Sequence, residues 1–186
     1  MQIYWTSDWH LNHFNIIKYT GRPFHTLDEM NSIIIKNFNE RVKEDDLVFF
    51  LGDFIFRSGS KRGEGEKDKP DYFLKQLKCQ HIIFIGGNHD KNNSLKTPIQ
   101  NIGIRYGGKR INLVHNPEFC NINYDINICG HVHDKWRIKR YHKGEQFTDC
   151  INVAVEQWNY KPITWMEIWQ EYSRWLKQGC QNETKN

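Results

Sequence analysis

The sequence predicts an α/β fold built from α+β layers. In the first half of the chain, apolar runs that are typical of buried strands alternate with segments of helical spacing. In the second half, three apolar runs follow one another with no helical segment between them. This order favours layers of mixed strands over a uniform Rossmann sheet, in which the alternation would continue to the end.

Length and composition indicate one folded domain. A chain of 186 residues is long enough to bury a sizeable core, and seven Trp and eleven Phe argue against a disordered chain. The formal net charge of +4 is compatible with an anionic substrate but is too small to indicate nucleic-acid binding. We expect a single domain over residues 1–176 and a flexible C-terminal tail over residues 177–186.

The N-terminus and the cysteines favour a cytoplasmic protein. The first ten residues lack the basic segment and apolar run of a signal peptide, and no apolar run approaches the roughly 20 residues that span a bilayer. The five cysteines are scattered and form no C-x-x-C pair, as expected of reduced thiols. We therefore expect a cytoplasmic location, no membrane partner and no zinc–thiolate site.

The elements of the first half follow from apolar spacing. Residues 3–7 (IYWTS) predict a short strand, and residues 46–51 (DLVFFL) predict a strand that is buried on both faces. Between them, residues 25–42 predict a helix that Thr26 or Asp28 could cap. The apolar residues of this helix share one face: Leu27, Met30, Ile34 and Phe38.

The rest of the chain predicts a loop, two helices and four strands. The glycine- and charge-rich residues 58–70 predict a loop. Helices are predicted over residues 71–77 and 163–176, the second from the helical spacing of its aromatic side chains. The predicted strands are residues 81–85, 110–115, 124–130 and 149–155.

Side chains of the metal-ligand type recur where these strands end. Asp8 and His10 follow the first predicted strand, and Asp53 follows the second. The later strands are followed by Asn88 and His89, by His115, and by His131 and His133. Because ligands of α/β proteins gather at the carboxyl ends of the strands, we expect these side chains to converge on one rim.

This set of side chains suits a pair of divalent cations. Nitrogen and oxygen donors without thiolate suit Mn, Fe, Zn, Ni or Mg. In Asp8-x-His10 and His131-x-His133, the alternation of an extended segment puts both side chains on the same side. Seven such ligands exceed the needs of one tetrahedral ion and suffice for two ions that share a bridging carboxylate.

The motifs, in this order, resemble those of the calcineurin-like metallophosphoesterase family. The resemblance is carried by Asp8-Trp9-His10, Gly52-Asp53, Gly87-Asn88-His89-Asp90, His115 and Gly130-His131-Val132-His133. The segment TSDWHLNHFNIIKYTGRPF also resembles a small bacterial and phage subgroup of that family. The fold that this resemblance implies is a β-sandwich flanked by helices.

The resemblance also implies a role for each matching residue. One metal would be held by Asp8, His10, Asp53 and His133, and the other by Asp53, Asn88, His115 and His131, with Asp53 as the bridge. A hydroxide that bridges the metals would attack the phosphoester in line, and His89 would assist the leaving group as a general acid. The two cations would be Mn, Fe, Zn or Ni, with Mn favoured.

Residues beside the motifs are candidates for supporting roles. Asp90 could orient His89 or close the turn through backbone hydrogen bonds. His13 is a candidate for supporting a metal ligand. Arg22 is a candidate contact of the substrate phosphate, and a structural salt bridge is an equal alternative. The acidic end of residues 152–156 (NVAVE) is interpreted as a packing feature.

The predicted function is hydrolysis of phosphoesters, with phosphodiesters favoured by analogy with small relatives. A phosphomonoesterase and a nuclease are alternatives, although a chain of this size leaves little room for a nucleic-acid groove. A catalytically silent scaffold of the same fold, which binds a partner without metal, is an alternative of another class. The complete set of ligand positions argues against it. The sequence leaves the substrate, the physiological metal and the oligomeric state open.

Overall fold

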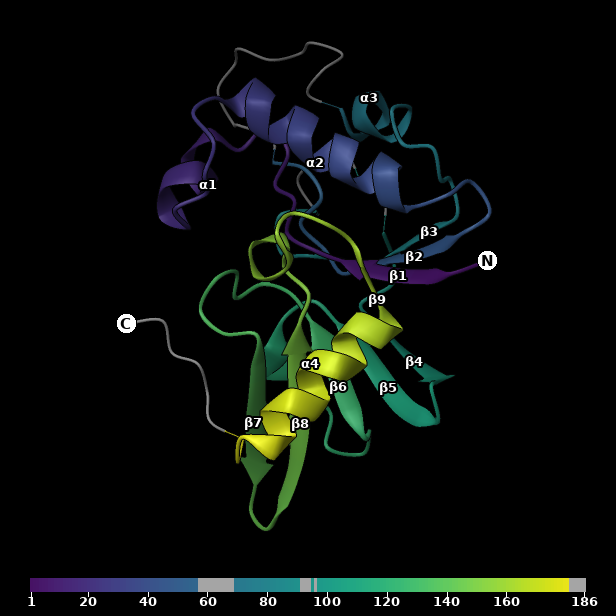
Figure 1. Cartoon of the computed structure of the whole chain (residues 1–186), viewed down its shortest axis with the longest axis vertical. Coiled ribbons are helices and arrows are strands. Elements are labelled where there is room, and N and C mark those ends of the chain that lie inside the picture. Colours follow the sequence, from purple (N-terminus) through teal and green to yellow (C-terminus); the bar gives the residue numbers. More distant parts are fainter. Residues whose placement is uncertain (57–68, 91–94, 96, 181–186) are drawn as a thin grey trace.

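The computed structural model describes residues 1–56, 69–90, 95 and 97–180 as two β-sheets packed in a sandwich with helices on its flanks (Figure 1). The α/β layer fold expected from the sequence is therefore confirmed. Most of the predicted loop over residues 58–70 and the end of the predicted tail, residues 181–186, lie outside the described residues.

The first sheet has the strand order β3-β2-β1-β9. It consists of β1 (Ile3–Thr6), β2 (Leu47–Phe50), β3 (Ile82–Phe84) and β9 (Ile163–Thr164). The first three strands run parallel, and β9 runs antiparallel to β1. The carboxyl ends of β1, β2 and β3 therefore lie at one edge of the sheet.

The second sheet has the strand order β4-β5-β6-β8-β7. It consists of β4 (Asn101–Tyr106), β5 (Lys109–Val114), β6 (Ile126–Cys129), β7 (Ile138–Lys143) and β8 (Gln146–Asn152). The central strands β5, β6 and β8 run parallel, whereas β4 and β7 pair antiparallel at the two edges.

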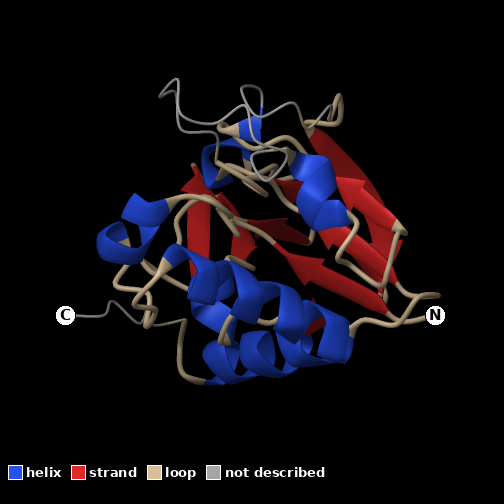
Figure 2. Ribbon diagram, turned by 90° about the horizontal axis from the view of Figure 1, so that it is seen from above, coloured by secondary structure: helices blue, strands red, loops and turns tan. Residues whose placement is uncertain are grey.

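Helices lie above and beside these sheets (Figures 1 and 2). They are α1 (Phe14–Tyr19), α2 (Leu27–Arg41), α3 (Pro70–Leu74) and α4 (Trp165–Lys177). The hydroxyl of Thr26 caps α2 by accepting a hydrogen bond from the Glu29 N–H at 3.1 Å. Two short 3-10 helices, η3 (Pro117–Phe119) and η4 (Val155–Trp158), follow β5 and β8.

Alternation along the strands divides the core into two parts. Trp5 and Phe49 face the second sheet, whereas Tyr4, Val48 and Phe50 face the helices. Strands that bury both faces need apolar residues at every position, which explains the unbroken apolar run of β2. The core between the sheets also contains three residues of α4: Ile168, Tyr172 and Trp175.

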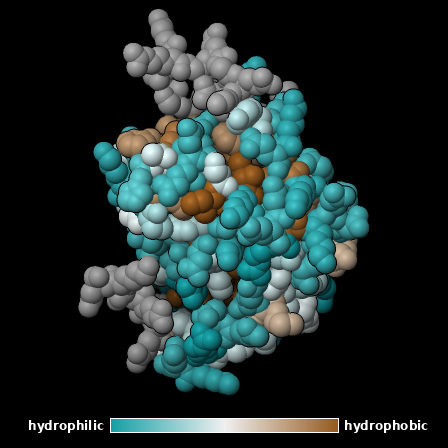
Figure 3. All heavy atoms as spheres, turned by 45° about the horizontal axis from the view of Figure 1, so that its top comes forward, coloured by the Kyte–Doolittle hydropathy of each residue, from teal (hydrophilic) through white to brown (hydrophobic). Residues whose placement is uncertain are grey.

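The surface over the upper part of the molecule is mostly hydrophilic, with small apolar patches (Figure 3). In the described part of the chain, no helix combines the length and the apolar character that crossing a membrane requires.

The predicted strands are confirmed with shifted ends, but the strands β4, β7 and β9 and the helix α1 were not predicted from the sequence. The missed strands β4 and β7 are edge strands whose solvent-facing residues are charged or polar, so they lack a continuous apolar run. The missed strand β9 occupies the first two residues of the predicted helix 163–176, and pairing with β1 overrides helix formation there. The missed helix α1 has only six residues.

Packing between the sheets should control stability. Ile128 is 0% exposed in the core between them, so Ile128→Ala should lower the free energy of unfolding by about 2–5 kcal/mol in urea titrations. The matched variant Ile128→Val removes one methylene and should cost only about 0.5–1.5 kcal/mol. Equal stability of both variants would contradict this packing.

Candidate metal centre

The two sheets meet at the rim where their parallel strands end, and the predicted ligands gather there. Asp8 and His10 follow β1, Asp53 follows β2, and Asn88 and His89 follow β3. His115 follows β5, and His131 and His133 follow β6. The strands of the first sheet are thus followed by both carboxylates, the amide and two imidazoles. The strands of the second sheet are followed by imidazoles only.

One group of donors surrounds the Asp8 carboxylate. Asp8 Oδ1 lies 3.9 Å from His10 Nε2 and 3.9 Å from His133 Nε2. One donor atom from each of the three residues lies within 4.8 Å of the other two. Atoms spaced in this way surround a point that each can reach with a metal–ligand bond of about 2.0–2.2 Å.

A second group surrounds the Asp53 carboxylate and overlaps the first. Asp53 Oδ2 lies 3.5 Å from His10 Nε2 and 3.4 Å from His115 Nε2. The donor atoms of Asp53, His115 and His131 lie within 4.8 Å of one another. A single oxygen of Asp53 is therefore shared between the two groups of imidazoles.

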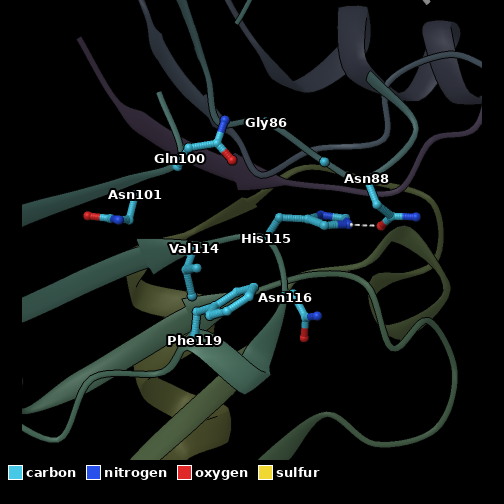
Figure 4. A pocket seen from close by; sticks show the side chains of 9 residues that line it. Gly86, Asn88, Gln100, Asn101, Val114, His115, Asn116 and Phe119 are labelled. Carbon is cyan, nitrogen blue, oxygen red and sulfur yellow. Dashed lines mark hydrogen bonds between the residues drawn. The ribbon is translucent and has the colours of Figure 1, made fainter. Parts of the chain in front are cut away.

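The Asn88 side chain completes the second group. Its Oδ1 lies 3.0 Å from His115 Nε2, as the dashed line in Figure 4 shows, and 3.0 Å from His131 Nδ1. The amide oxygen and the two ring nitrogens thus form a cluster of donor atoms that one cation could bind.

The burial of the Asp8, Asp53 and His10 side chains is consistent with a site that binds cations. Asp8 and Asp53 are buried, and a buried carboxylate is costly unless an opposite charge compensates it. Both ring nitrogens of His10 are buried, and neither has a hydrogen-bond partner within the described residues. Burial also holds the pKa of His10 well below its usual value, so the ring is neutral, as a metal ligand must be.

Hydrogen bonds to the far side of two imidazoles orient them toward the centre. His115 Nδ1 lies 2.6 Å from the Leu51 carbonyl oxygen, to which it donates. His133 Nδ1 lies 2.9 Å from Glu156 Oε1. These bonds leave the Nε2 atom of each ring facing the Asp carboxylates, which is the arrangement that metal-binding histidines commonly show.

The backbone at the ligands is strained. Five of the predicted ligands have left-handed φ angles between 49° and 71°: Asp8, His10, Asp53, His131 and His133. Such angles cost non-glycine residues about 1–3 kcal/mol each and concentrate at functional sites. Backbone N–H groups fix the positions of the carboxylates. Asp8 Oδ2 accepts a hydrogen bond from the His131 N–H and Asp53 Oδ1 accepts one from the His89 N–H, both at 2.9 Å.

Two glycines allow strand ends of the first sheet to touch. A Cβ atom at Gly87 would overlap Asp53 Oδ1, and a Cβ atom at Gly52 would lie 2.7 Å from the Gly87 Cα. The glycines before Asp53 and Asn88 are therefore required by close approach of the two loops rather than by turn geometry alone.

The Asp90 carboxylate accepts hydrogen bonds from three backbone N–H groups. They belong to Asp53 at 2.9 Å, Gly87 at 2.8 Å and Phe54 at 3.2 Å. Of the two roles considered for Asp90, this geometry favours closure of the turn over orientation of the His89 ring.

Arg22 is buried beneath the site. It is only 4% exposed, and its guanidinium donates to the carbonyl oxygens of Asp8 and Trp9, each at 2.8 Å, and to Glu156 Oε1 at 2.7 Å. The geometry thus favours the salt bridge over direct contact with a substrate phosphate.

Glu156 is the functional residue that the sequence interpretation missed, since NVAVE was read as packing. Its Oε1 accepts from both Arg22 and His133. Burial acts to raise the pKa of Glu156, but the bond to His133 and the charge of Arg22 outweigh it and lower the pKa to about 2. The available signal was an acidic residue just after a strand, the pattern that located the other site residues.

His89 and His13 line the outer side of the site. A ring nitrogen of His89 lies within 4.8 Å of donor atoms of His10 and Asp53. The His13 ring stacks on Phe56 with centroids 3.8 Å apart, and its centroid lies 6.3 Å from that of His89. His89 is half-buried, so its ring is accessible to a substrate at the rim.

Loss of the Glu156 charge should weaken metal binding. Glu156→Gln removes the charge that Arg22 and His133 share, and we expect Mn²⁺ affinity to fall about 10–100-fold in calorimetric titrations. Glu171→Gln changes a partly exposed carboxylate on α4 and should leave the affinity unchanged. Equal affinities in the two variants would contradict the role of Glu156.

Gly87→Ala should also weaken metal binding, because its Cβ displaces the Asp53 carboxylate. We expect at least about a tenfold loss of Mn²⁺ affinity. Gly86→Ala is the matched control, since the atom nearest its Cβ is the end of the flexible Gln100 side chain at 2.9 Å, and the Ile99 carbonyl oxygen lies at an ordinary contact distance of 3.5 Å. A Gly87→Ala protein that binds Mn²⁺ as tightly as the Gly86→Ala protein would exclude this role of the close contact.

Known proteins are similar to this chain in sequence and in fold. Residues 1–185 match the family described as calcineurin-like phosphoesterase. The uncharacterized protein MJ1445 of Methanocaldococcus jannaschii is 37% identical over 172 residues, which cover 88% of this chain and 86% of the relative. The structure of AQ665, a protein of unknown function from Aquifex aeolicus, has 27% identity and a TM-score of 0.65 and covers 91% of this chain and 98% of its own.

A more distant structure is YfcE, a phosphoesterase from E. coli, with 18% identity, a TM-score of 0.45 and coverage of 89% of this chain and 82% of its own. The family match extends over nearly the whole chain, and the clustered Asp, His and Asn side chains occupy the ends of strands from both sheets. The chain belongs to the calcineurin-like phosphoesterase family.

Proposed function

We propose that this protein is a dinuclear-metal-dependent phosphoesterase that prefers phosphodiesters. The observation that carries the proposal is the position of Asp53 Oδ2, which lies 3.5 Å from His10 Nε2 and 3.4 Å from His115 Nε2. A carboxylate oxygen between two sets of donors suits two cations that share one bridging ligand.

Each metal position draws on both sheets. Asp8, His10, Asp53 and His133 would hold one cation, and Asp53, Asn88, His115 and His131 would hold the other. Two bound cations would neutralise the phosphate charge and activate the attacking water as hydroxide, in line with the leaving group. Oxygen and nitrogen donors without thiolate suit Mn, Fe, Zn or Ni, and we favour Mn.

The His89 residue has two parts in this proposal. Its backbone N–H holds Asp53 Oδ1 at 2.9 Å, which fixes the shared carboxylate. Its ring lies at the rim and would donate a proton to the leaving oxygen, a contribution of roughly 10²–10⁴-fold in rate. The His13 ring lies beside it, with the two centroids 6.3 Å apart.

The preference for phosphodiesters rests on analogy with small relatives, and the space beside the site accommodates an organic ester group. A pocket of about 390 Å³ adjoins Asn88 and His115, so the phosphate can carry a bulky organic group there.

Two substitutions separate metal binding from proton donation. Asp53→Asn removes the shared charge and should abolish both metal binding and hydrolysis, whereas His89→Gln should keep the metal content and lose about 10²–10⁴-fold in rate. Elemental analysis measures the metal, and a panel of phosphomonoesters, phosphodiesters and cyclic nucleotides with different divalent ions measures the rate.

Four results would contradict parts of this proposal. Full activity of His89→Gln on a substrate with a poor leaving group would contradict the role of His89 as a general acid. Absence of bound metal together with absence of hydrolysis after addition of Mn²⁺ would contradict the enzyme and support a binding scaffold. Faster hydrolysis of monoesters than of diesters would contradict the substrate preference, and steeply salt-dependent DNA or RNA binding would favour a nuclease.

A further inference from the structure

The pocket beside the candidate metal centre differs in chemistry from the centre itself. It has a volume of about 390 Å³ and begins at Asn88 and His115 (Figure 4). The side chains that define the rest of its wall come from the start of β4, the end of β5 and η3: Gln100, Asn101, Val114, Asn116 and Phe119. Volumes of this order, roughly 300–1,000 Å³, are typical of small-molecule sites.

One wall of the pocket is apolar and aromatic. Val114 is buried under it, and Phe119 is 70% exposed, so its ring is accessible from the pocket. In Figure 4, Val114 and Phe119 lie on the side of the pocket opposite Gln100. A planar ring that enters the pocket could therefore stack on the Phe119 ring.

The opposite wall offers amide groups. The side chains of Gln100 and Asn101 have no hydrogen-bond partner among the described residues, and both are exposed. An amide presents a donor and an acceptor side by side, so it can pair with a ring edge that carries both. The third amide, Asn116, is held in place because its Oδ1 accepts from the Glu118 N–H at 2.9 Å.

The described side chains that line the pocket include no Lys, Arg, Asp or Glu. A second phosphate or a carboxylate would therefore find no Lys or Arg partner there. The occupant best matched to an aromatic wall, free amides and a lining without Lys, Arg, Asp or Glu is a planar, neutral ring with hydrogen-bonding edges.

We propose that this pocket binds the nucleobase of a nucleoside phosphoester, with the base stacked on Phe119 and its edge bound by Gln100 and Asn101. The inference rests on the proposed function, because it places the phosphate of the same molecule at Asn88 and His115. It narrows the substrate class from phosphoesters in general to those that carry a nucleoside.

Nucleoside binding tests the pocket without hydrolysis. Adenosine contains no phosphoester, so its affinity for the purified protein with Mn²⁺ present can be measured by calorimetry, with ribose as the control ligand. We expect adenosine to bind and ribose not to bind. Phe119→Ala should weaken adenosine binding by about 5- to 150-fold, since base stacking on an aromatic ring contributes roughly 1–3 kcal/mol.

The matched control is Phe147→Ala, which removes another exposed aromatic ring, on β8 and away from the pocket. It should leave adenosine affinity unchanged. Gln100→Ala is a second variant, which should weaken adenosine binding without altering Mn²⁺ affinity. Circular dichroism spectra that match the wild-type spectrum would show that these surface substitutions leave the fold intact.

The outcomes distinguish this inference from the proposed function. Equal adenosine affinity in the Phe119→Ala and wild-type proteins, or no adenosine binding at all, would overturn the nucleobase pocket even if simple phosphodiesters are hydrolysed. Adenosine binding that depends on Phe119, in a protein that hydrolyses no phosphoester, would support the pocket and contradict the enzyme.

Discussion

The Asp8 carboxylate joins the two sheets, and the rest of the site depends on this contact. It is 0% exposed at the end of β1, and its Oδ2 accepts a hydrogen bond at 2.9 Å from the His131 N–H, which follows β6 in the other sheet. The bond from His115 to the Leu51 carbonyl crosses the same junction. Because buried carboxylates are costly without compensation, the junction is stable only if donors or cations surround it.

Several features of the chain follow from that requirement. The left-handed backbone at ligands such as Asp8 and Asp53 directs their side chains inward. The absence of a side chain at Gly87 leaves room for the Asp53 carboxylate. Arg22 binds the Asp8 carbonyl and the Glu156 carboxylate from below. These contacts hold the donors in place before any cation binds, which reduces the conformational entropy that metal binding would otherwise lose.

The site is closed on one side and open on the other. Asp8 and His10 are buried against Arg22 and the first sheet, whereas Asn88 is exposed and borders the pocket. In the proposed function, a substrate would approach from the side of Asn88, with its phosphate toward the donors and its organic group toward Phe119. The proposal thus assigns specificity to η3 and the start of β4, and reactivity to the strand ends.

The sequence by itself determined the layered α/β class, the central strands, and the eight metal-ligand and acid candidates, because apolar runs that end in ligand-type residues are local patterns. It did not reveal the edge strands β4 and β7, because their exposed residues interrupt the apolar pattern and they form strands by pairing with their neighbours. It also did not reveal the short helix α1. Only the tertiary structure decided that Glu156 supports His133 and that Asp90 closes a turn. Both roles depend on contacts between segments distant in sequence, and no local spacing encodes such contacts.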